Sequence, residues 1–299
     1  MNIVVLGAGA IGSLFGALLS KKNTVVLVGR AAHADAIQKN GLTITGKTTL
    51  KVNIQAKDSI KNIDSPPDLL LVTVKSYDTK NAVEEAKSLI SDKTTILSLQ
   101  NGLDNIQKIK SVVPDANVLA GVTTHGAILA KPGLIQHTGI GATSIGELSG
   151  KKTERLERIV SSFCEAGVDT NVSTNITTDI WKKAIVNASI NPLTAFFNCK
   201  NGYLLENPCL EPIVEKVCSE ATAVSQTEGL NISYEEMIES TKEVIRITSD
   251  NYSSMLQSVQ RGKKTEIDSI NGIIVKQGKH NGKDVPLNEL LVYLISSLS

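Results

Sequence analysis

The stretch NIVVLGAGAIGSLFGALL, residues 2–19, joins a short β-branched run to a glycine cluster and then to an apolar segment of helical composition. Three glycines form the pattern G-x-G-x-x-G directly after the predicted strand. In this setting they permit a tight turn, let a pyrophosphate approach the backbone, and let helix and strand pack closely. The free N–H groups at the helix start favour phosphate. A glycine turn without a ligand is the alternative. The sequence therefore predicts a dinucleotide site at Gly7, Ala8, Gly9, Ala10, Ile11 and Gly12.

A second predicted strand, residues 24–28, ends at Gly29 and Arg30. Folds that bind NAD usually place Asp or Glu near this point to hold the ribose hydroxyls, whereas an Arg suits a 2′-phosphate. Charge-assisted hydrogen bonds from a guanidinium contribute about 1.5–3 kcal/mol each, which favours NADP(H) by roughly 10-fold or more. A solvated loop residue is the alternative for Arg30. We therefore expect NADP(H), with NAD(H) as the second option.

Two further predicted strands point to the same edge of the sheet. Residues 68–74 form a continuous apolar run, as expected of a parallel strand covered on both faces, and end at Lys75. Residues 94–99 lead into an Asn-Gly turn at Asn101. Ligands gather beyond the carboxyl ends of parallel strands, so Lys75 and Asn101 are candidate cofactor or substrate contacts. A surface lysine and a plain turn are the alternatives.

The 299-residue chain fits two domains of ordinary size. Residues 118–146 alternate β-formers with Gly and Thr, and we expect several short strands that close the sheet, with His125 and His137 in structural roles. From about residue 174 the pattern is helical almost throughout. The expected fold class is therefore α/β: an N-terminal Rossmann-type dinucleotide-binding domain over residues 1–174, followed by an all-helical C-terminal domain over residues 175–299.

The first helix of the second half carries a row of polar side chains. Lys183, Asn187 and Asn191 recur every four residues and so share one face. Beside an apolar surface such groups are unfavourable unless something polar meets them. A protonated lysine can donate a proton to a bound carbonyl or stabilise the alkoxide that hydride delivery creates. Amides bind a carboxylate or hydroxyl without adding charge. A simply solvated face is the alternative.

Later segments also read as helices. Pro192 is expected to limit the regular part of the polar-faced helix, because proline removes one backbone donor and disfavours α geometry before it. A capping-box signature at residues 233–236 predicts a long helix that extends through Asn251 and Ser254, which share a face. Residues 263–268 are expected to open another helix, and a proline starts the last one.

Composition excludes several classes of partner. The chain has 31 basic and 30 acidic side chains, a formal net charge of +1, and no charge block, so neither nucleic acid nor an anionic membrane surface is expected. Residues 1–20 carry no charge, but their glycines disfavour a membrane helix and no Lys or Arg precedes the apolar run as in a signal peptide. We expect a cytoplasmic protein.

The cysteines show neither a C-x-x-C pair nor interleaved histidines, so no metal site is expected. Free thiols in a reducing compartment are the prediction. The four cysteines are Cys164, Cys199, Cys209 and Cys218.

Across nearly its whole length the chain resembles the ketopantoate reductase (2-dehydropantoate 2-reductase) family. Two segments, WKKAIVNASINPLTA at 181–195 and NYSSMLQ at 251–257 with its continuation TEIDSING at 265–272, are far more specific than the glycine motif. GAGAIG at 7–12 and LQNG at 99–102 complete the resemblance.

The resemblance implies hydride transfer from NADPH to C2 of 2-dehydropantoate, giving pantoate for pantothenate and coenzyme A biosynthesis. It implies Lys183 as the general acid and Glu266 as a carboxylate that orients substrate and lysine. Asn101 would lie between nicotinamide and substrate, and Arg30 and Lys75 would contact the cofactor. The polar row would face the cleft between the domains. Positions implied to hold the substrate's carboxylate and hydroxyl are Asn187, Asn191, Asn201, Asn251 and Ser254.

Two other functions remain open at this point. One is a related NAD(P)H reductase that acts on another 2-keto acid or on an imine. The other is a catalytically silent NADP(H)-binding sensor, which would be expected to lose Lys183 or Glu266, although both are present. Some relatives accept NADH, so Arg30 does not decide the cofactor. The partner expected is a small keto acid, and the apolar helical domain is compatible with a homodimer.

Overall fold

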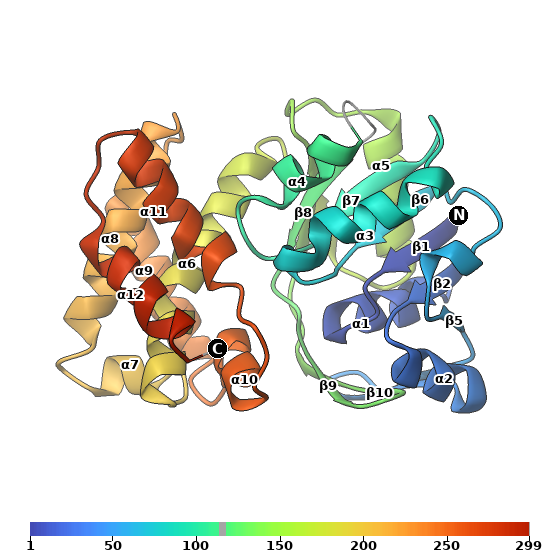
Figure 1. Ribbon diagram of the computed structural model, residues 1–299, viewed down its shortest axis with the longest axis horizontal. Helices are drawn as coiled ribbons and strands as arrows, with labels where there is room; N and C mark the ends of the chain where they lie inside the picture. The colour runs from blue at the N-terminus through green and yellow to red at the C-terminus, as the bar shows by residue number, and fades with distance from the viewer. Residues whose placement is uncertain (114–117, 299) are drawn as a thin grey trace. The chain divides into compact units, whose positions relative to one another are not determined.

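The computed structural model describes residues 1–113 and 118–298. Contacts divide the chain into two compact units (Figure 1). The sequence predicted a single boundary near residue 174 and did not anticipate that a short segment after residue 100 would be grouped with the helical unit. The first unit comprises residues 1–100 and 105–177, and the second comprises 101–104 and the chain from Thr178 onward.

The main sheet of the first unit contains β1 (Asn2–Leu6), β2 (Thr24–Val28), β5 (Gln55–Lys57), β6 (Leu69–Val72), β7 (Thr95–Ser98), β8 (Val118–Thr123), β11 (Thr143–Glu147) and β12 (Thr170–Val172). Its order is β12-β11-β8-β7-β6-β1-β2-β5. Neighbouring strands from β8 to β5 run parallel, and β11 is antiparallel to β8. Parallel strands need covering on both faces, which explains their near-continuous apolar sequences.

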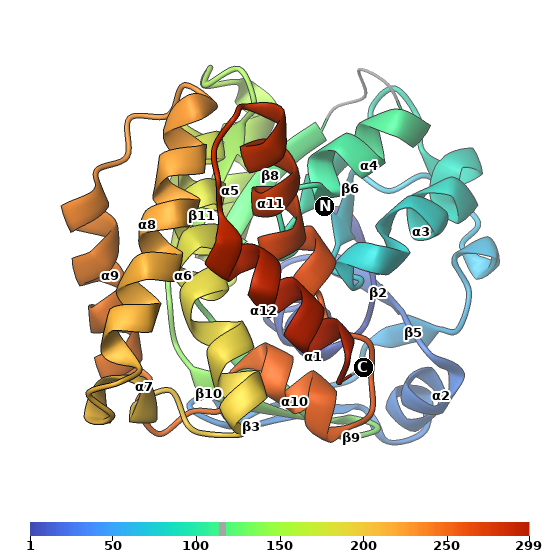
Figure 2. The ribbon, with the colours of Figure 1, turned by 60° about the vertical axis from the view of Figure 1, so that its left-hand side comes forward.

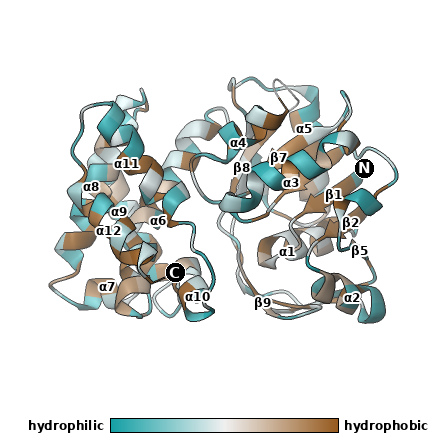
Figure 3. Ribbon diagram, in the orientation of Figure 1, coloured by the Kyte–Doolittle hydropathy of each residue, from teal (hydrophilic) through white to brown (hydrophobic). Residues whose placement is uncertain are grey.

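The helices of the first unit are α1 (Ala10–Leu19), α2 (Ala31–Asn40), α3 (Thr79–Ala86), α4 (Asn105–Val112) and α5 (Glu154–Glu165), with short 3-10 turns η1 (Ile60–Asn62), η2 (Ser76–Asp78) and η3 (Lys87–Leu89). Successive strand residues point to opposite faces. Ile3 and Val5 therefore join a core with α1 and α5, whereas Val4 and Leu6 join a core with α3 and α4. Figure 3 shows the apolar strands between these helices.

A second, four-stranded sheet covers the outer side of α1. It contains β3 (Leu42–Gly46), β4 (Leu50–Val52), β9 (Gly126–Lys131) and β10 (Leu134–Gly139), in the order β4-β3-β10-β9. All four strands contact α1. The expectation that residues 118–146 close the main sheet is therefore right for β8 and β11 and wrong for β9 and β10. Strand β9 pairs with β10, and β10 pairs with β3 of the β3–β4 hairpin instead.

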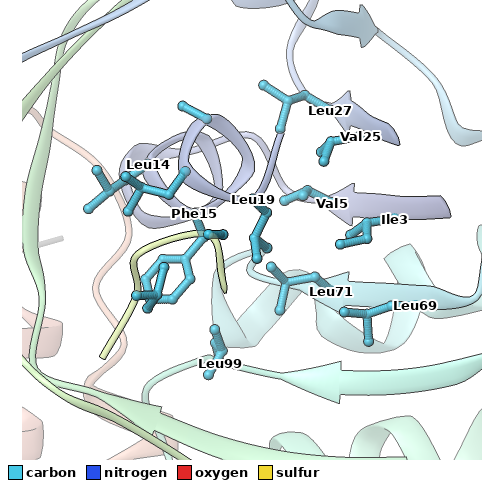
Figure 4. Close-up of a cluster of buried hydrophobic side chains, with 14 of the residues drawn as sticks. Ile3, Val5, Leu14, Phe15, Leu19, Val25, Leu27, Leu69, Leu71 and Leu99 are labelled. Carbon is cyan, nitrogen blue, oxygen red and sulfur yellow. The ribbon is translucent and has the colours of Figure 1, made fainter. Parts of the chain in front are cut away.

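Burial between two sheets explains why α1 carries no charged residue. Leu14, Phe15 and Leu19 are fully buried, and Figure 4 shows them beside Val5 and Leu71 of the main sheet. Burying a side chain of this size contributes about 1.5–3 kcal/mol. Within the described residues, no helix has the length and apolar character needed to cross a membrane.

The second unit is helical. Its elements are α6 (Ile176–Phe197), α7 (Tyr203–Glu206), α8 (Glu211–Thr227), α9 (Tyr234–Ile247), α10 (Ser254–Gln260), η4 (Ile267–Ser269), α11 (Asn271–His280) and α12 (Pro286–Ser296). Helices α8, α11 and α12 contact one another, and α9 packs on α8 (Figure 2). The predicted fold class, an α/β Rossmann-type part followed by a helical part, is confirmed.

Pro192 does not end α6, contrary to the sequence-based expectation. The helix continues through it to Phe197. Proline leaves the carbonyl four residues earlier without its helical donor. Here the Asn271 side chain supplies one, since its Nδ2 donates to the Ala188 carbonyl at 3.2 Å. A tertiary contact thus compensates a local break.

The predicted long helix through Asn251 and Ser254 is also wrong. Helix α9 does begin at the predicted capping box, with Ser233 Oγ accepting from the Glu236 N–H at 3.0 Å, but it ends at Ile247. Asn251 lies in the connection, and Ser254 is the first residue of α10 because Ser253 caps that helix. Residues 263–266 likewise lie outside any helix.

We predict that Gly12→Ala destabilises the protein by about 1–3 kcal/mol through overpacking. A Cβ at Gly12 would lie 2.3 Å from the Gly7 carbonyl oxygen and 2.4 Å from Thr73 Oγ1. Gly9→Ala is the matched control, since its Cβ would meet only the Gly7 oxygen, at 3.9 Å. Denaturant unfolding of both variants checks this. Equal stability losses would contradict the steric argument.

Candidate active site

The carboxyl ends of four parallel strands meet at one edge of the main sheet. The register pairs Leu6 with Val28 of β2 and with Val72 of β6, and β7 continues the same alignment. The segments that follow these strands therefore start side by side. They carry the glycine turn, Arg30 and Lys75, which the sequence placed at this edge. Such an edge is where open parallel sheets bind ligands.

The glycine turn is shaped as a cradle. Gly7 has φ +109°, a conformation that favours glycine, and a Cβ there would lie 2.4 Å from the Val74 nitrogen. Thr73 Oγ1 donates to the Gly7 carbonyl at 2.8 Å and fixes the turn. At Gly9, by contrast, the nearest atom to an added Cβ is 3.9 Å away, so the backbone is open to approach.

Gly9 is also the N-cap residue of α1 and has no side chain to cap it, and the first turn of the helix holds no acidic residue. In this first turn, no side chain therefore offsets the positive end of the helix dipole or the free N–H groups at the start of α1, and both can interact with an anion. A group with two linked phosphates fits these residues, because it needs close backbone approach and unshielded N–H donors. The predicted pyrophosphate contacts, Gly7 to Gly12, all lie in this turn and the first turn of α1.

Arg30 and Lys75 occupy corresponding places in the connections that follow β2 and β6. Arg30 is exposed and is the N-cap residue of α2, directly after β2. Lys75 is half-buried and is the N-cap residue of η2, after β6. Gln100, just past β7, donates from Nε2 to the Val74 carbonyl at 2.8 Å and so ties two of these connections together. Both cations are therefore held near the sheet edge by short segments.

Asn101 directly follows Gln100, yet residues 101–104 group with the helical unit. The Leu103 N–H donates to the Ser269 carbonyl at 2.9 Å, and the Leu103 side chain packs on a cluster that contains Trp181 and Ile185. The Asn-Gly turn is thus part of a segment anchored to α6 and η4. The sequence placed Asn101 at a strand end but contained no signal for this anchoring.

Lys183, Asn187 and Asn191 all lie on α6. Asn191 is buried, and the other two are half-buried. Burial lowers the pKa of Lys183 to about 8, whereas the negative charge of Glu266 acts in the opposite direction and raises it. Glu266 is itself buried, at the end of the connection that precedes η4. The fold thus places an ammonium and a carboxylate, 83 residues apart in the chain, within electrostatic reach of each other.

Asn201 and Asn251 are joined through the backbone, since the Asn201 N–H donates to the Asn251 carbonyl at 3.0 Å. The Asn201 side chain is buried and donates from Nδ2 to Thr248 Oγ1 at 2.8 Å. Its Oδ1 is buried without a hydrogen-bond partner in the described part of the chain. A buried unpartnered acceptor is unfavourable and is suited to a ligand donor. Asn251 and Ser254 are exposed.

Two polar residues beside the predicted site were missed. Thr265, next to Glu266, is buried, and its hydroxyl has no partner among the described residues. Ser253 accepts from Thr194 Oγ1 at 2.8 Å and thereby links α10 to α6. The only indication in the sequence was that Ser253 and Thr265 lie in the segments 251–257 and 265–272, which carry the family resemblance.

All four cysteines are free, and residues 1–113 and 118–298 contain no group of three or more His, Cys, Asp or Glu that could hold a metal.

Comparisons with known proteins agree with this geometry. The sequence model of the family described as ketopantoate reductase PanE/ApbA matches residues 3–150, and that of its C-terminal part matches residues 175–299. The 2-dehydropantoate 2-reductase of Pyrococcus horikoshii is 41% identical over 298 residues, which cover 99% of this chain and 97% of that protein.

Solved structures are similar over the full length. A PanE/ApbA family ketopantoate reductase from Ralstonia eutropha has a TM-score of 0.92 at 30% identity, covering 100% of this chain and 98% of that one. D-mandelate dehydrogenase in a ternary structure with NADH and anilino(oxo)acetate has a TM-score of 0.94 at 27% identity, with the same coverage of 100% and 98%. The resemblance predicted from the sequence is confirmed: the chain belongs to the ketopantoate reductase family.

Proposed function

We propose that this chain is a 2-dehydropantoate 2-reductase that uses NADPH and forms pantoate for pantothenate and coenzyme A biosynthesis. The observation that carries the proposal is Lys183, an amine of lowered pKa that interacts with the buried carboxylate of Glu266. Relatives from 34% to 41% identical that span nearly the whole chain bear this enzyme's name. If Lys183 and Glu266 only stabilised the fold, the amides of Asn187 and Asn191 on the same helix face would not be needed.

Lys183 is the proposed general acid. A bound reduced nicotinamide supplies the hydride. As the C2 carbonyl becomes an alkoxide, Lys183 transfers a proton from Nζ to that oxygen, so that the ketone becomes a secondary alcohol. A pKa of about 8 keeps most of the amine protonated at neutral pH and makes it a stronger acid than an ordinary lysine. General acid catalysis of this kind contributes about 10²–10⁴-fold.

Glu266 is proposed to orient the Lys183 ammonium and the substrate. Its carboxylate offsets part of the desolvation that favours neutral Lys183. The substrate's own carboxylate and hydroxyl are assigned to neutral groups, which bind them without further charge. The unpartnered Asn201 Oδ1 suits the hydroxyl proton. The proposed substrate contacts are Asn101, Asn187, Asn191, Asn201, Asn251 and Ser254.

NADP(H) is the proposed cofactor. The cradle from Gly7 to Gly12 would hold the pyrophosphate, and Lys75 would contact the bound cofactor. Arg30 follows β2, where a guanidinium suits a 2′-phosphate, and the connection offers no Asp or Glu for ribose hydroxyls at Gly29 or Arg30. NAD(H) is the alternative, since the similar D-mandelate dehydrogenase was solved with NADH.

A second candidate function is reduction of another 2-keto acid. The structural likeness to D-mandelate dehydrogenase with anilino(oxo)acetate favours it, because the same fold there meets a different oxo acid. Comparing ketopantoate with phenylglyoxylate under identical conditions separates the two. A catalytically silent sensor is disfavoured, since Lys183 and Glu266 are both present.

We propose that the enzyme acts in the cytoplasm. A homodimer is compatible with the exposed side chains of Leu290 and Tyr293 on α12.

We predict that Lys183→Ala lowers kcat on ketopantoate by at least ~10², because the acid that meets the alkoxide is lost. NADPH affinity, measured by fluorescence titration, should stay near the wild-type value. Lys182→Ala is the matched control: the neighbouring lysine pairs with Glu236, and its removal should change turnover less than ~3-fold, as expected of an accessible ion pair. Near-normal turnover of Lys183→Ala would exclude the acid role.

The pH dependence follows from the same residue. Lys183 must be protonated to act as an acid, so kcat/KM for ketopantoate should fall as pH rises through about 8. Glu266→Gln removes the charge that raises this pKa, and the alkaline limb should therefore move to lower pH. Steady-state rates measured from pH 6 to 10 test both statements. A profile that is flat up to pH 10 would contradict them.

Arg30→Ala should raise the Kd for NADPH by roughly 10-fold or more while changing that for NADH little, because only NADPH carries the 2′-phosphate. Titration of the purified protein with each nucleotide measures this. Arg158→Ala, at an exposed position of α5, is the matched control. Equal losses for the two nucleotides would contradict the assignment.

A further inference from the structure

The helix that carries Lys183 contains a proline at a defined weak point. Pro192 has no N–H, so the carbonyl of Ala188, four residues earlier, loses its normal helical donor. A buried carbonyl without a partner is unfavourable. Because Ala188 is fully buried and follows Asn187, this orphaned acceptor lies in the middle of the polar-faced helix.

Asn271 fills that position from another part of the chain. Its Nδ2 donates to the Ala188 carbonyl at 3.2 Å and to Asn288 Oδ1 at 3.0 Å. Asn271 is fully buried, and its own Oδ1 has no hydrogen-bond partner among the described residues. The amide therefore serves as a donor only. An apolar residue would avoid the unpaired oxygen, so the two donated bonds are what the asparagine provides there.

The far end of this chain of hydrogen bonds is firmly held. Asn288, also fully buried, donates from Nδ2 to the Val217 carbonyl at 3.2 Å and to Glu220 Oε2 at 2.8 Å. The Glu220 carboxylate in turn accepts the Leu287 and Asn288 N–H groups at 3.0 Å each, at the start of α12. Charge-assisted hydrogen bonds of this type are among the stronger ones. Asn271 is thus clamped between α6 on one side and α8 and α12 on the other.

Asn271 is the first residue of α11 and follows Glu266 by five residues, with the single turn of η4 between them. A fixed Asn271 therefore limits where the Glu266 backbone can lie relative to α6. The contact at Ala188 directly follows Asn187 and lies five residues, between one and two helical turns, from Lys183. Because Pro192 lacks an N–H, the Ala188 carbonyl is free to accept a hydrogen bond from Asn271. This bond links the helix of Lys183 to the segment that carries Glu266.

We infer that Asn271 is a positioning residue, which replaces the donor missing at Pro192 and thereby holds Glu266 in place beside the helix of Lys183. The positioning of Glu266 is tested by kinetics and so rests on the proposed function. The replacement of the donor missing at Pro192 is tested by unfolding and does not depend on that function.

A double-mutant cycle between Asn271→Leu and Pro192→Ala tests the structural half by thermal unfolding. Asn271→Leu should lower Tm by roughly 2–8 °C, because buried acceptors lose their donor. Pro192→Ala restores an N–H to the helix, so the Tm loss caused by Asn271→Leu should be clearly smaller in that background. The hydrogen bond from Asn271 to Asn288 is lost equally with Pro192 in place and in the Pro192→Ala background, so its contribution to the Tm change cancels in the cycle. Equal losses in the two backgrounds would overturn the replacement of the Pro192 donor.

Kinetics test the positioning half. Asn271→Leu should lower kcat on ketopantoate by at least ~10-fold, since small misplacements of catalytic groups have large effects on rate. The alkaline limb of kcat/KM should move to lower pH, because Glu266 then raises the pKa of Lys183 less. Pro192→Ala should not restore either property, since the link to Glu266 stays broken. Unchanged kcat and an unchanged limb would overturn the positioning role.

Asn281→Leu is the matched control, at the other end of α11. Asn281 donates to Thr227 Oγ1 at 2.9 Å and to Glu228 Oε1 at 2.7 Å, and these bonds do not involve Ala188 or Asn288. The loss of Asn281 should therefore leave the alkaline limb of kcat/KM unchanged. If Asn271→Leu yields too little folded protein, Asn271→Ser is used, with the same outcomes expected because its shorter side chain cannot serve both acceptors. A wild-type protein that is inactive on ketopantoate would refute the proposed function alone, because the Tm cycle reads the Pro192–Asn271 coupling without any substrate.

Discussion

The close approach of α1 to the main sheet is the constraint on which the first unit depends. At Gly12 no space remains for a Cβ beside the Gly7 carbonyl and Thr73. This contact lets the helix sit against β1, so that its N-terminal amides meet the carboxyl edge of the parallel strands. The other side of α1 is covered by a second sheet, which explains why the helix carries no charged residue. The turn proposed to bind the nucleotide is thus also a sterically tight part of the core packing.

In the helical unit two opposing electrostatic effects act on Lys183. Desolvation favours the neutral amine, whereas Glu266 favours the ammonium, and the result is a pKa of about 8. An amine with this value still carries a proton at neutral pH and gives it up more readily than a surface lysine. The arrangement is therefore sensitive to the distance between α6 and the segment before η4. The buried amides of Asn271 and Asn288 link α6 to the start of α11, which follows η4.

Membership of the ketopantoate reductase family agrees with both halves of this description. An uncapped helix start at the sheet edge suits a dinucleotide, and a tuned lysine beside amides suits a small keto acid. The likeness to D-mandelate dehydrogenase shows that the same architecture serves a different oxo acid. Differences in substrate preference within this fold therefore need not come from differences in architecture.

The sequence by itself determined the α/β class, the strand–glycine–helix turn and the spacing of Lys183, Asn187 and Asn191, because these follow from short-range periodicity and from what glycine alone permits. Tertiary structure alone decided the rest. Strands β9 and β10 join a separate sheet, since alternation reveals a strand but not its partner. Helix α6 passes through Pro192 because a distant asparagine supplies the missing donor. Likewise, the interaction of Glu266 with Lys183 depends on long-range packing, which no local pattern encodes.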